Sequence, residues 1–363
     1  MKIWLISDTH FGKYAIDSDK WLNIMTSYFY DFFIPTLKKH KKPGDILFFL
    51  GDLYDNRTSI NIKVINTVVK LFEDLSEIID IHMILGNHDN FNMIDTDINS
   101  ICTIRNIKNI TIYEQPNQII FDGLKIAIMP WIYGKDNEIK ILEKYSGSDL
   151  LFCHSDLNGC RTQLYPTRPL SKRILDITDF KGYGKVYSGH IHIVQEINNF
   201  TFVGCPYHLD RNDYENVKGI FVYDTKKKTD FFIENNFSPE FKKIKILKDS
   251  DFDILKKELE TNNFIDLQIS NNLLLNSPHL RLELDKLTNK YKIENLEFIN
   301  DIVKEIKPRL QSNTLKNKSI KDISHEWIDA IKINDDTDLF TEIELKNKMK
   351  ETIEDCFKLI ENK

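Results

Sequence analysis

Short apolar runs alternate with longer amphipathic stretches along the first part of the chain. The runs Lys2–Ile6, Asp45–Leu50 and Ile79–Leu85 predict buried strands, because each is largely apolar and is followed by turn-forming polar residues. Between them, apolar residues recur at helical spacing from Ser18 or Asp19 to about Lys39, and from Thr58 or Ser59 to about Leu75. This βαβαβ beginning predicts a layered α/β fold.

The alternation continues to about residue 238 and then changes. Further strands are expected at Ile110–Tyr113, Ile119–Phe121, Leu124–Met129, Leu150–Cys153, Val186–Ser188 and Phe200–Val203, with a hairpin of Gly219–Tyr223 and Asp230–Ile233. A smaller mixed α/β region follows, then a polar stretch and two amphipathic helical patterns. We therefore expect three domains, at residues 1–238, 239–310 and 311–363, the last being a linker with C-terminal helices.

Composition and charge exclude several classes of protein. With 363 residues and 41% hydrophobic positions, the chain can bury a large core, which excludes a natively disordered protein. Basic residues number 49 against 55 acidic ones, a net charge of −6, so any contact with nucleic acid must come from a local basic surface. No apolar run approaches the length of a membrane span or a signal-peptide core. Five cysteines without a C-x-x-C pair suit reduced thiols, so we expect a cytoplasmic protein.

Five short polar segments each follow a predicted strand and together hold five of the ten histidines. They are Asp8-Thr9-His10, Gly51-Asp52-Leu53-Tyr54-Asp55, Gly86-Asn87-His88-Asp89, the lone His154, and Gly189-His190-Ile191-His192. Strand ends of an open α/β sheet meet at one edge, so we expect these side chains to converge. Carboxylates, one amide and imidazoles form a donor set that suits manganese, iron or zinc.

A pair of cations about 3.5–4 Å apart needs a shared ligand. Asp52 is the best candidate for this bridging carboxylate, since it follows a glycine at a strand end. The glycines before Asp52, Asn87 and His190 are expected to let the chain turn sharply, so that the next side chain points at the metals.

The motifs D-x-H, G-D-x-x-D, G-N-H-D, a lone His and G-H-x-H, in this order, resemble the calcineurin-like metallophosphoesterase superfamily. Within it the chain most resembles the SbcD-type DNA repair nucleases, above all the recombination endonuclease subunit of tailed bacteriophages. The narrower resemblance rests on Asp156–Gly159, on Gly204–Tyr207 and on the additional C-terminal regions. It implies a four-layer β-sandwich flanked by helices, a small α/β cap and a helical C-terminus.

The resemblance also implies a set of ligands for two metal ions, most often manganese in this family. Asp8, His10, Asp52 and His192 would surround one ion, and Asp52, Asn87, His154 and His190 the other. His88 would protonate the leaving oxygen or stabilise the transition state.

One position departs from the cellular nucleases, which usually carry a histidine three residues after the bridging aspartate. This chain has Asp55 there, as the phosphoprotein phosphatases of the superfamily do. We hypothesise that the Asp55 carboxylate bonds a nitrogen of His88 and fixes its tautomer. The alternative is that Asp55 is an ordinary turn residue.

Contact with DNA requires positive side chains near the site, because phosphate neutralisation dominates the affinity. The candidates lie on loops after the motifs and on a basic strand: Arg57, Arg161, Arg168, Lys172, Arg173, Lys242, Lys243 and Lys245. The resemblance implies that the cap orients duplex DNA. It also implies that the C-terminal helices grip an SbcC-like ATPase in a heterotetramer with two copies of this chain. Docking of these helices on the chain's own core is the alternative.

The sequence thus predicts a manganese-dependent DNA nuclease of recombination and repair, located in the host cytoplasm if a phage encodes it. The resemblance implies 3′–5′ exonuclease action on duplex ends and endonuclease action on single strands or hairpins. A metallophosphatase or cyclic-nucleotide phosphodiesterase with the same metals is the first alternative. A binding platform that has lost catalysis is the second, although every expected ligand position is filled.

Overall fold

The computed structural model describes residues 1–13, 18–94, 96–162, 170–261, 263–290, 293, 295–299, 325, 328–329 and 346–353. Contacts group Met1–Asn300 into one compact unit and Asp301–Lys363 into a second. The expected linker and most of the expected C-terminal helices lie outside the described residues, although 346–353 are helical. The predicted domain limits at 238 and 310 stay predictions. Among the described helices, none combines the length and apolar character needed to cross a bilayer.

The first of two six-stranded sheets has the order β12-β11-β1-β2-β3-β4. Strands β1 (Lys2–Ile6), β2 (Ile46–Phe49), β3 (Asp80–Ile84) and β4 (Ile110–Tyr113) run parallel. The hairpin of β11 (Gly219–Asp224) and β12 (Thr229–Glu234) joins β1 in antiparallel register. The strands expected from the apolar runs are therefore present.

The second sheet has the order β5-β6-β7-β8-β10-β9. Its parallel centre consists of β6 (Leu124–Met129), β7 (Leu150–Cys153), β8 (Lys185–Ser188) and β10 (Phe200–Phe202). Antiparallel strands β5 (Asn117–Phe121) and β9 (Gln195–Ile197) form its edges. The sequence did not predict β9, because it is short and largely polar.

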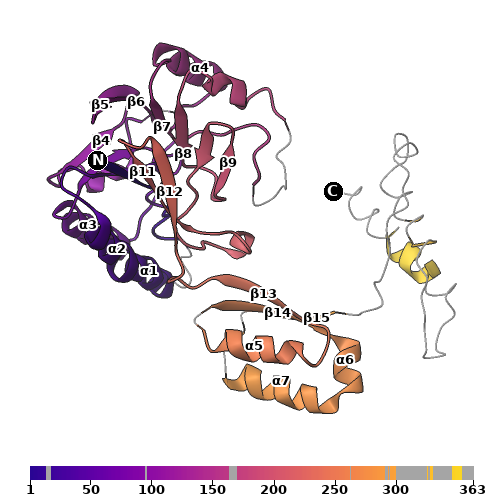
Figure 1. Cartoon of the computed structure of the whole chain (residues 1–363). Coiled ribbons are helices and arrows are strands. Elements are labelled where there is room, and N and C mark those ends of the chain that lie inside the picture. Colours follow the sequence, from indigo (N-terminus) through magenta and orange to yellow (C-terminus); the bar gives the residue numbers. More distant parts are fainter. Residues whose placement is uncertain are drawn as a thin grey trace. The chain divides into compact units, whose positions relative to one another are not determined.

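The two sheets pack face to face, and helices cover their outer faces (Figure 1). In β1, Ile3 and Leu5 enter the core between the sheets, whereas Trp4 and Ile6 pack toward the helices. Helices α1 (Ser18–Ser27), α2 (Ile34–His40) and α3 (Ile62–Ser76) cover the first sheet, and α4 (Lys135–Lys144) covers the second. The predicted four-layer arrangement is confirmed.

Two helix boundaries differ from the sequence prediction. The expected helix to Lys39 contains a wider π-helical turn at Tyr28–Phe33, where Pro35 has no N–H to offer the carbonyl of Asp31. The next helix is capped by Asn61, whose side chain accepts from the N–H of Lys63 at 2.8 Å. The expected caps, Thr58 and Ser59, donate their N–H groups to the side chain of Asn56 instead. The helix therefore begins at Ile62.

The small α/β region after Ser238 forms a parallel sheet with one face covered by helices (Figure 1). Its strands are β13 (Phe241–Ile246), β14 (Phe264–Ser270) and β15 (Asn295–Ile299), and its helices are α5 (Asp251–Leu259), α6 (Asn271–Asn276) and α7 (Pro278–Lys290). Phe241 and Phe264 stack on Trp21 of α1, with ring centroids 5.8 and 5.2 Å apart. This aromatic contact joins the small sheet to the helices of the first layer. We call residues 239–300 the cap region.

Candidate metal centre

The parallel strands of both sheets deliver the motif residues to one place. Loops after β1, β2 and β3 carry Asp8, His10, Asp52 and Asn87, and loops after β7 and β8 carry His154, His190 and His192. The first four and His154 are buried, and the two remaining histidines are half-buried. The predicted convergence at the strand ends is therefore present.

One cluster forms around Asp8, His10 and His192. The Nε2 atoms of the two imidazoles lie 3.0 Å apart. Asp8 Oδ1 lies 4.0 Å from Nε2 of His10 and 3.8 Å from Nε2 of His192. Three donor atoms from two segments far apart in the sequence thus surround a common point.

A second cluster forms around the side-chain oxygen of Asn87. This oxygen lies 3.0 Å from His154 Nε2 and 2.8 Å from His190 Nδ1. His154 Nε2 is also 3.4 Å from Asp52 Oδ2. This is the ligand set that the resemblance implies for the second ion.

Asp52 lies between the two clusters. Its Oδ2 atom is 3.7 Å from His10 Nε2 and 3.4 Å from His154 Nε2. Its other oxygen accepts the N–H of His88 at 2.7 Å, which fixes the carboxylate plane. The position suits a carboxylate shared by two cations.

The spacing of these atoms fits metal binding. Ligands about 2.0–2.2 Å from one ion lie roughly 3–4 Å from each other, which is the range found in both clusters. Imidazole nitrogens, carboxylates and an amide oxygen together suit manganese, iron or zinc. The residues present therefore fit a pair of divalent cations.

Backbone conformation is unusual at these residues. Asp8, His10, Asp52 and His190 have φ angles of 53°, 47°, 58° and 81°. Residues other than glycine rarely adopt this left-handed region, and such conformations concentrate at functional sites. The local strain is offset by hydrogen bonds, such as those from the N–H of His190 to the Asp8 carboxylate at 3.1 Å.

The two glycines beside the ligands Asp52 and Asn87 are required for different reasons. Gly51 has a φ angle of 95°, a conformation that suits glycine. A Cβ at Gly86 would lie 2.1 Å from Asp52 Oδ1, so this glycine is required by space rather than by its φ angle. The expected sharp turn before Asp52 is present, whereas Gly86 allows close approach.

The electrostatics of the clusters favour bound positive charge. Burial raises the pKa of Asp8, and burial next to His10 holds the pKa of His192 well below its ordinary value. Burial alone would lower the pKa of His154, but the charges of Asp52 and Asp8 outweigh it and raise the pKa to about 9. The same imidazole keeps the pKa of Asp52 low despite burial. Protons and divalent cations compete for such a site.

The hypothesised pairing of the Asp55 carboxylate with His88 is wrong. That carboxylate lies 3.2 Å from Nδ1 of His10, and this pairing lowers the pKa of Asp55 although its burial opposes the shift. His88 Nδ1 instead donates to the main-chain carbonyl of Asp55 at 2.6 Å. Motif spacing brings Asp55 near both rings, but it does not distinguish a side-chain acceptor from a main-chain one. The tautomer of His88 is thus fixed by the backbone.

His88 lies beside the first cluster. Its ring centroid is 4.8 Å from that of His10, in an edge-to-face arrangement. Because Nδ1 carries the proton donated to Asp55, Nε2 is the remaining acceptor of the neutral ring. Burial lowers the pKa of His88.

Asp89 has a supporting role that the sequence did not reveal. Its buried carboxylate accepts the N–H groups of Gly86, Asp52 and Leu53 at 2.8–3.0 Å. It therefore ties the loop after β3 to the loop after β2. The sequence signal was its place directly after Asn87 and His88, but no spacing rule assigns it these partners.

Two segments quoted only for the resemblance also support the ligands. Asp156 Oδ2 lies 3.7 Å from His190 Nε2, and the Tyr207 hydroxyl donates to the carbonyl of Thr9 at 2.7 Å. Thr9 lies between Asp8 and His10 in the sequence. Both segments therefore contact the loops that carry candidate ligands.

The basic residues expected to contact DNA fall into different environments. Arg57 donates its Nε–H to the carbonyl of Asn87 at 2.7 Å, so it supports a ligand loop. Arg161, Lys172 and Arg173 are exposed. Arg168 lies outside the described residues.

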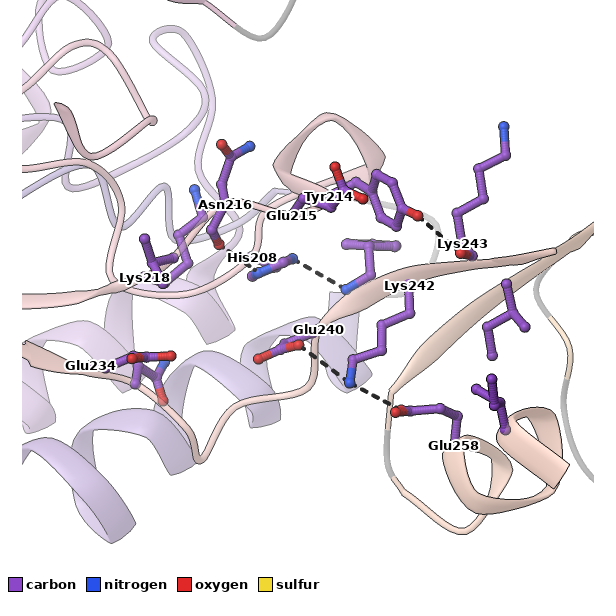
Figure 2. A pocket seen from close by; sticks show the side chains of 15 residues that line it. His208, Tyr214, Glu215, Asn216, Lys218, Glu234, Glu240, Lys242, Lys243 and Glu258 are labelled. Carbon is purple, nitrogen blue, oxygen red and sulfur yellow. Dashed lines mark hydrogen bonds and ion pairs between the residues drawn. The ribbon is translucent and has the colours of Figure 1, made fainter. Parts of the chain in front are cut away.

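The basic strand β13 is divided between two faces. The Lys242 ammonium lies between Glu240 and Glu258, at 3.6 and 3.0 Å, as Figure 2 shows. Lys243 and Lys245 are exposed. Lys242 is therefore paired inside the cap region, and the other two are available at its surface.

Residues 1–194 match the family of calcineurin-like phosphoesterases. The chain belongs to this family. The match covers all the candidate ligands of both clusters, so the resemblance read from the motifs is confirmed.

Over nearly its full length this phosphoesterase is also similar to exonuclease subunit 1 of Enterobacteria phage T4. The two are 25% identical over 359 residues, which cover 96% of this chain and 98% of the phage protein. The solved structure of a novel archaeal phosphodiesterase is similar over 65% of this chain and 100% of its own, at 17% identity and a TM-score of 0.34.

Proposed function

We propose that this phosphoesterase is a two-metal DNA nuclease that acts with a second, ATP-hydrolysing subunit. The observation that carries the proposal is the position of Asp52 Oδ2, 3.7 Å from His10 and 3.4 Å from His154. In this proposal the Asp52 carboxylate would be a ligand common to both clusters, an arrangement that suits in-line hydrolysis of a phosphodiester by two metal ions. The full-length similarity to an exonuclease subunit supports DNA as substrate.

Two bound cations, manganese in this proposal, would neutralise the phosphate and activate the attacking water. Asp8, His10, Asp52 and His192 would hold one, and Asp52, Asn87, His154 and His190 the other. The Asp55 carboxylate lies 3.2 Å from Nδ1 of His10, and Nε2 of the same ring is directed at the cluster. Such carboxylate–imidazole pairs orient metal ligands and raise their basicity.

His88 would give a proton to the departing oxygen. The main-chain carbonyl of Asp55 fixes its tautomer, so Nε2 is the nitrogen that exchanges a proton with the substrate. Burial lowers the pKa of the free imidazole, and an arriving phosphodiester anion raises it again by stabilising the charged form.

The exposed basic residues would bind the phosphates of the DNA backbone. In this proposal Arg161, Lys172 and Arg173, with Lys243 and Lys245 of the cap region, contact phosphates, and Arg57 contributes its terminal nitrogens. Arg168 is kept as a candidate from the sequence alone. Substitution of any one should weaken binding of all DNA sequences and reduce its salt dependence.

The proposal is tested with metal-free full-length protein, supplied with Mn²⁺ or Mg²⁺ and three substrates. These are end-labelled linear duplex, closed circular single strand, and a chromogenic phosphodiester. We expect Mn²⁺-dependent cutting of DNA, with the label position giving the polarity and the circle reporting endonuclease action. Asp52→Asn should abolish all hydrolysis, and His88→Gln should abolish DNA hydrolysis while Mn²⁺ still binds.

Hydrolysis of the chromogen without any cutting of DNA would favour the metallophosphatase or cyclic-nucleotide phosphodiesterase alternative. Absence of all hydrolysis with Mn²⁺ bound would favour a binding platform.

The partner is proposed to be an SbcC-like ATPase, with two copies of each subunit. The similar phage protein is itself a subunit of an exonuclease, which supports an assembly. Deletion of residues 315–363 should abolish capture of the ATPase and leave nuclease activity intact. Undiminished capture by the truncated protein would refute the assignment of the C-terminal region.

A further inference from the structure

Lys218 is a buried cation that the proposed chemistry does not use. Its side chain is 1% exposed, directly before β11. Its ammonium contacts the Asp213 carboxylate at 2.5 Å, the main-chain carbonyl of His192 at 2.8 Å and the Cys205 sulfur at 2.9 Å. A lysine has three N–H donors, so these contacts account for all of them.

We propose that Lys218 is a positioning residue for His192, a candidate ligand of the first cluster. By holding the carbonyl of His192, it fixes the peptide from which the imidazole extends toward His10. The inference rests on the proposed metal site, which it deepens.

The loop after β8 carries His190 and His192, and different hydrogen bonds hold it at these two residues. Before His190, the N–H of Gly189 donates to the carbonyl of Cys153 at 3.1 Å. The N–H of His190 donates to the Asp8 carboxylate at 3.1 Å. Two residues further on, the carbonyl of His192 accepts from the Lys218 ammonium at 2.8 Å, from the N–H of Cys205 at 3.4 Å and from the Cys205 thiol at 3.6 Å. Of these three bonds, the one from Lys218 is the shortest and is charge-assisted.

Asp213 gives the lysine a fixed counter-charge. Its second oxygen accepts the N–H groups of Leu209 and Asp210 at 2.7 and 3.3 Å. Burial would raise the pKa of Asp213, but the neighbouring Lys218 outweighs it and holds the pKa at about 2. The pair is therefore ionised, and neither member can shift without leaving a buried charge unpaired.

The contacts around Lys218 and Asp213 continue into the cap region. Next to Asp213, the Arg211 guanidinium pairs with Asp266 of β14 at 2.7 Å. The Tyr214 hydroxyl donates to the carbonyl of Lys243 at 2.9 Å, a bond drawn in Figure 2. Figure 2 also shows Lys218 in the lining of the adjoining cavity of about 390 Å³. Lys218 thus connects a candidate ligand loop with the turn that holds the cap sheet.

The test uses metal-free full-length protein and Mn²⁺ as the probe, followed by calorimetry and by electron paramagnetic resonance of the bound ions. The main variant is the double substitution Lys218→Met with Asp213→Asn, because removing both charges avoids an unpaired buried ion. We expect wild-type protein to bind two Mn²⁺ with a spin-coupled signal. The double variant should stay folded, bind one ion as before and bind the other about tenfold or more weakly.

Lys135→Met is the matched control. Lys135 is a half-buried lysine that also donates to a carbonyl, that of Ile174 at 2.7 Å, and to a carboxylate, that of Asp176 at 2.9 Å. None of these three residues is a candidate ligand, so this variant should bind both ions as the wild type does.

A folded double variant that binds both ions with wild-type affinity and an unchanged spin-coupled signal would overturn the inference. A double variant that cannot be obtained folded would also count against it, because the pair would then support the fold as a whole. Wild-type protein that binds no Mn²⁺ would overturn the proposed function itself, and the inference with it.

Discussion

The contact between Asp55 and His10 makes a quantitative prediction about metal affinity. The Asp55 carboxylate lies 3.2 Å from His10 Nδ1, and its side chain is 32% exposed. Asp55→Asn keeps an oxygen at this position but removes its charge. Loss of a carboxylate behind a metal-ligating histidine costs about 10–100-fold in affinity. Because an acceptor remains and solvent reaches the site, we expect about tenfold, or about 1.4 kcal/mol.

Calorimetric titration of the metal-free variant with Mn²⁺ measures this loss directly. Asp210→Asn is a matched control, since Asp210 is similarly part-exposed and pairs with Lys13 at 3.2 Å, not with a candidate ligand. The alkaline limb of the pH profile of hydrolysis, which reports loss of the proton from the general acid His88, should stay unchanged in Asp55→Asn. The reason is that the main-chain carbonyl that holds His88 is not altered.

Unchanged Mn²⁺ affinity together with a displaced alkaline limb would refute this reasoning. That result would mean that the Asp55 carboxylate acts on His88, as the motif spacing first suggested. If the Asp210→Asn control lost as much Mn²⁺ affinity as Asp55→Asn, then charge near the site, rather than the contact with His10, would decide the affinity.

Three further predictions concern stability and space around the site. Asp89→Ala leaves three buried N–H groups without their acceptor. This change should lower the free energy of unfolding by about 2–5 kcal/mol, measured by urea denaturation. A loss below about 0.5 kcal/mol would contradict the assigned bonds. Burial, with the nearby Lys218, lowers the pKa of His208 to about 4, so its contribution to stability is complete above about pH 6.5 and is lost as the pH falls toward 4. In chelator, thermal midpoints should therefore fall more steeply between pH 6.5 and 5 for wild type than for His208→Gln, and parallel curves would refute this. Gly86→Ala should reduce Mn²⁺-dependent hydrolysis at least about tenfold, because the new methyl group would meet the side chain of Asp52. Gly123→Ala is the control, since open space surrounds its new methyl group. It should lower the free energy of unfolding by only about 1 kcal/mol and leave the activity unchanged.

The sequence predicted the strands and the convergence of the ligands because both depend on local pattern. Buried parallel strands are apolar on both faces, as β1 and β2 are, and their ends necessarily share one edge of a sheet. Polar residues directly after such strands are therefore placed by topology alone. The edge strand β9, which is short and largely polar, has no such pattern and was not predicted.

Residues that support the ligands could not be predicted in the same way. The partners of Lys218, at positions 192, 205 and 213, follow no regular spacing. Arg57 and Lys242 were expected to face DNA, but the structure gives Arg57 a carbonyl partner and Lys242 two carboxylates. Side-chain direction and the choice between main-chain and side-chain acceptors depend on the assembled fold. The pattern of charges along the sequence alone does not predict side-chain direction or hydrogen-bond acceptors.

The candidate ligands come from both sheets, with Asp8, Asp52 and Asn87 on one and His154 and His190 on the other. Ions held between them would act as cross-links across the sandwich, in addition to the apolar packing and to hydrogen bonds such as that from the N–H of His190 to the Asp8 carboxylate. Saturation of such a site at a hundredfold excess over its dissociation constant adds about 2.7 kcal/mol to stability. Chelation should consequently loosen both sheets together, so that hydrogen exchange at β2 and at β7 accelerates in parallel.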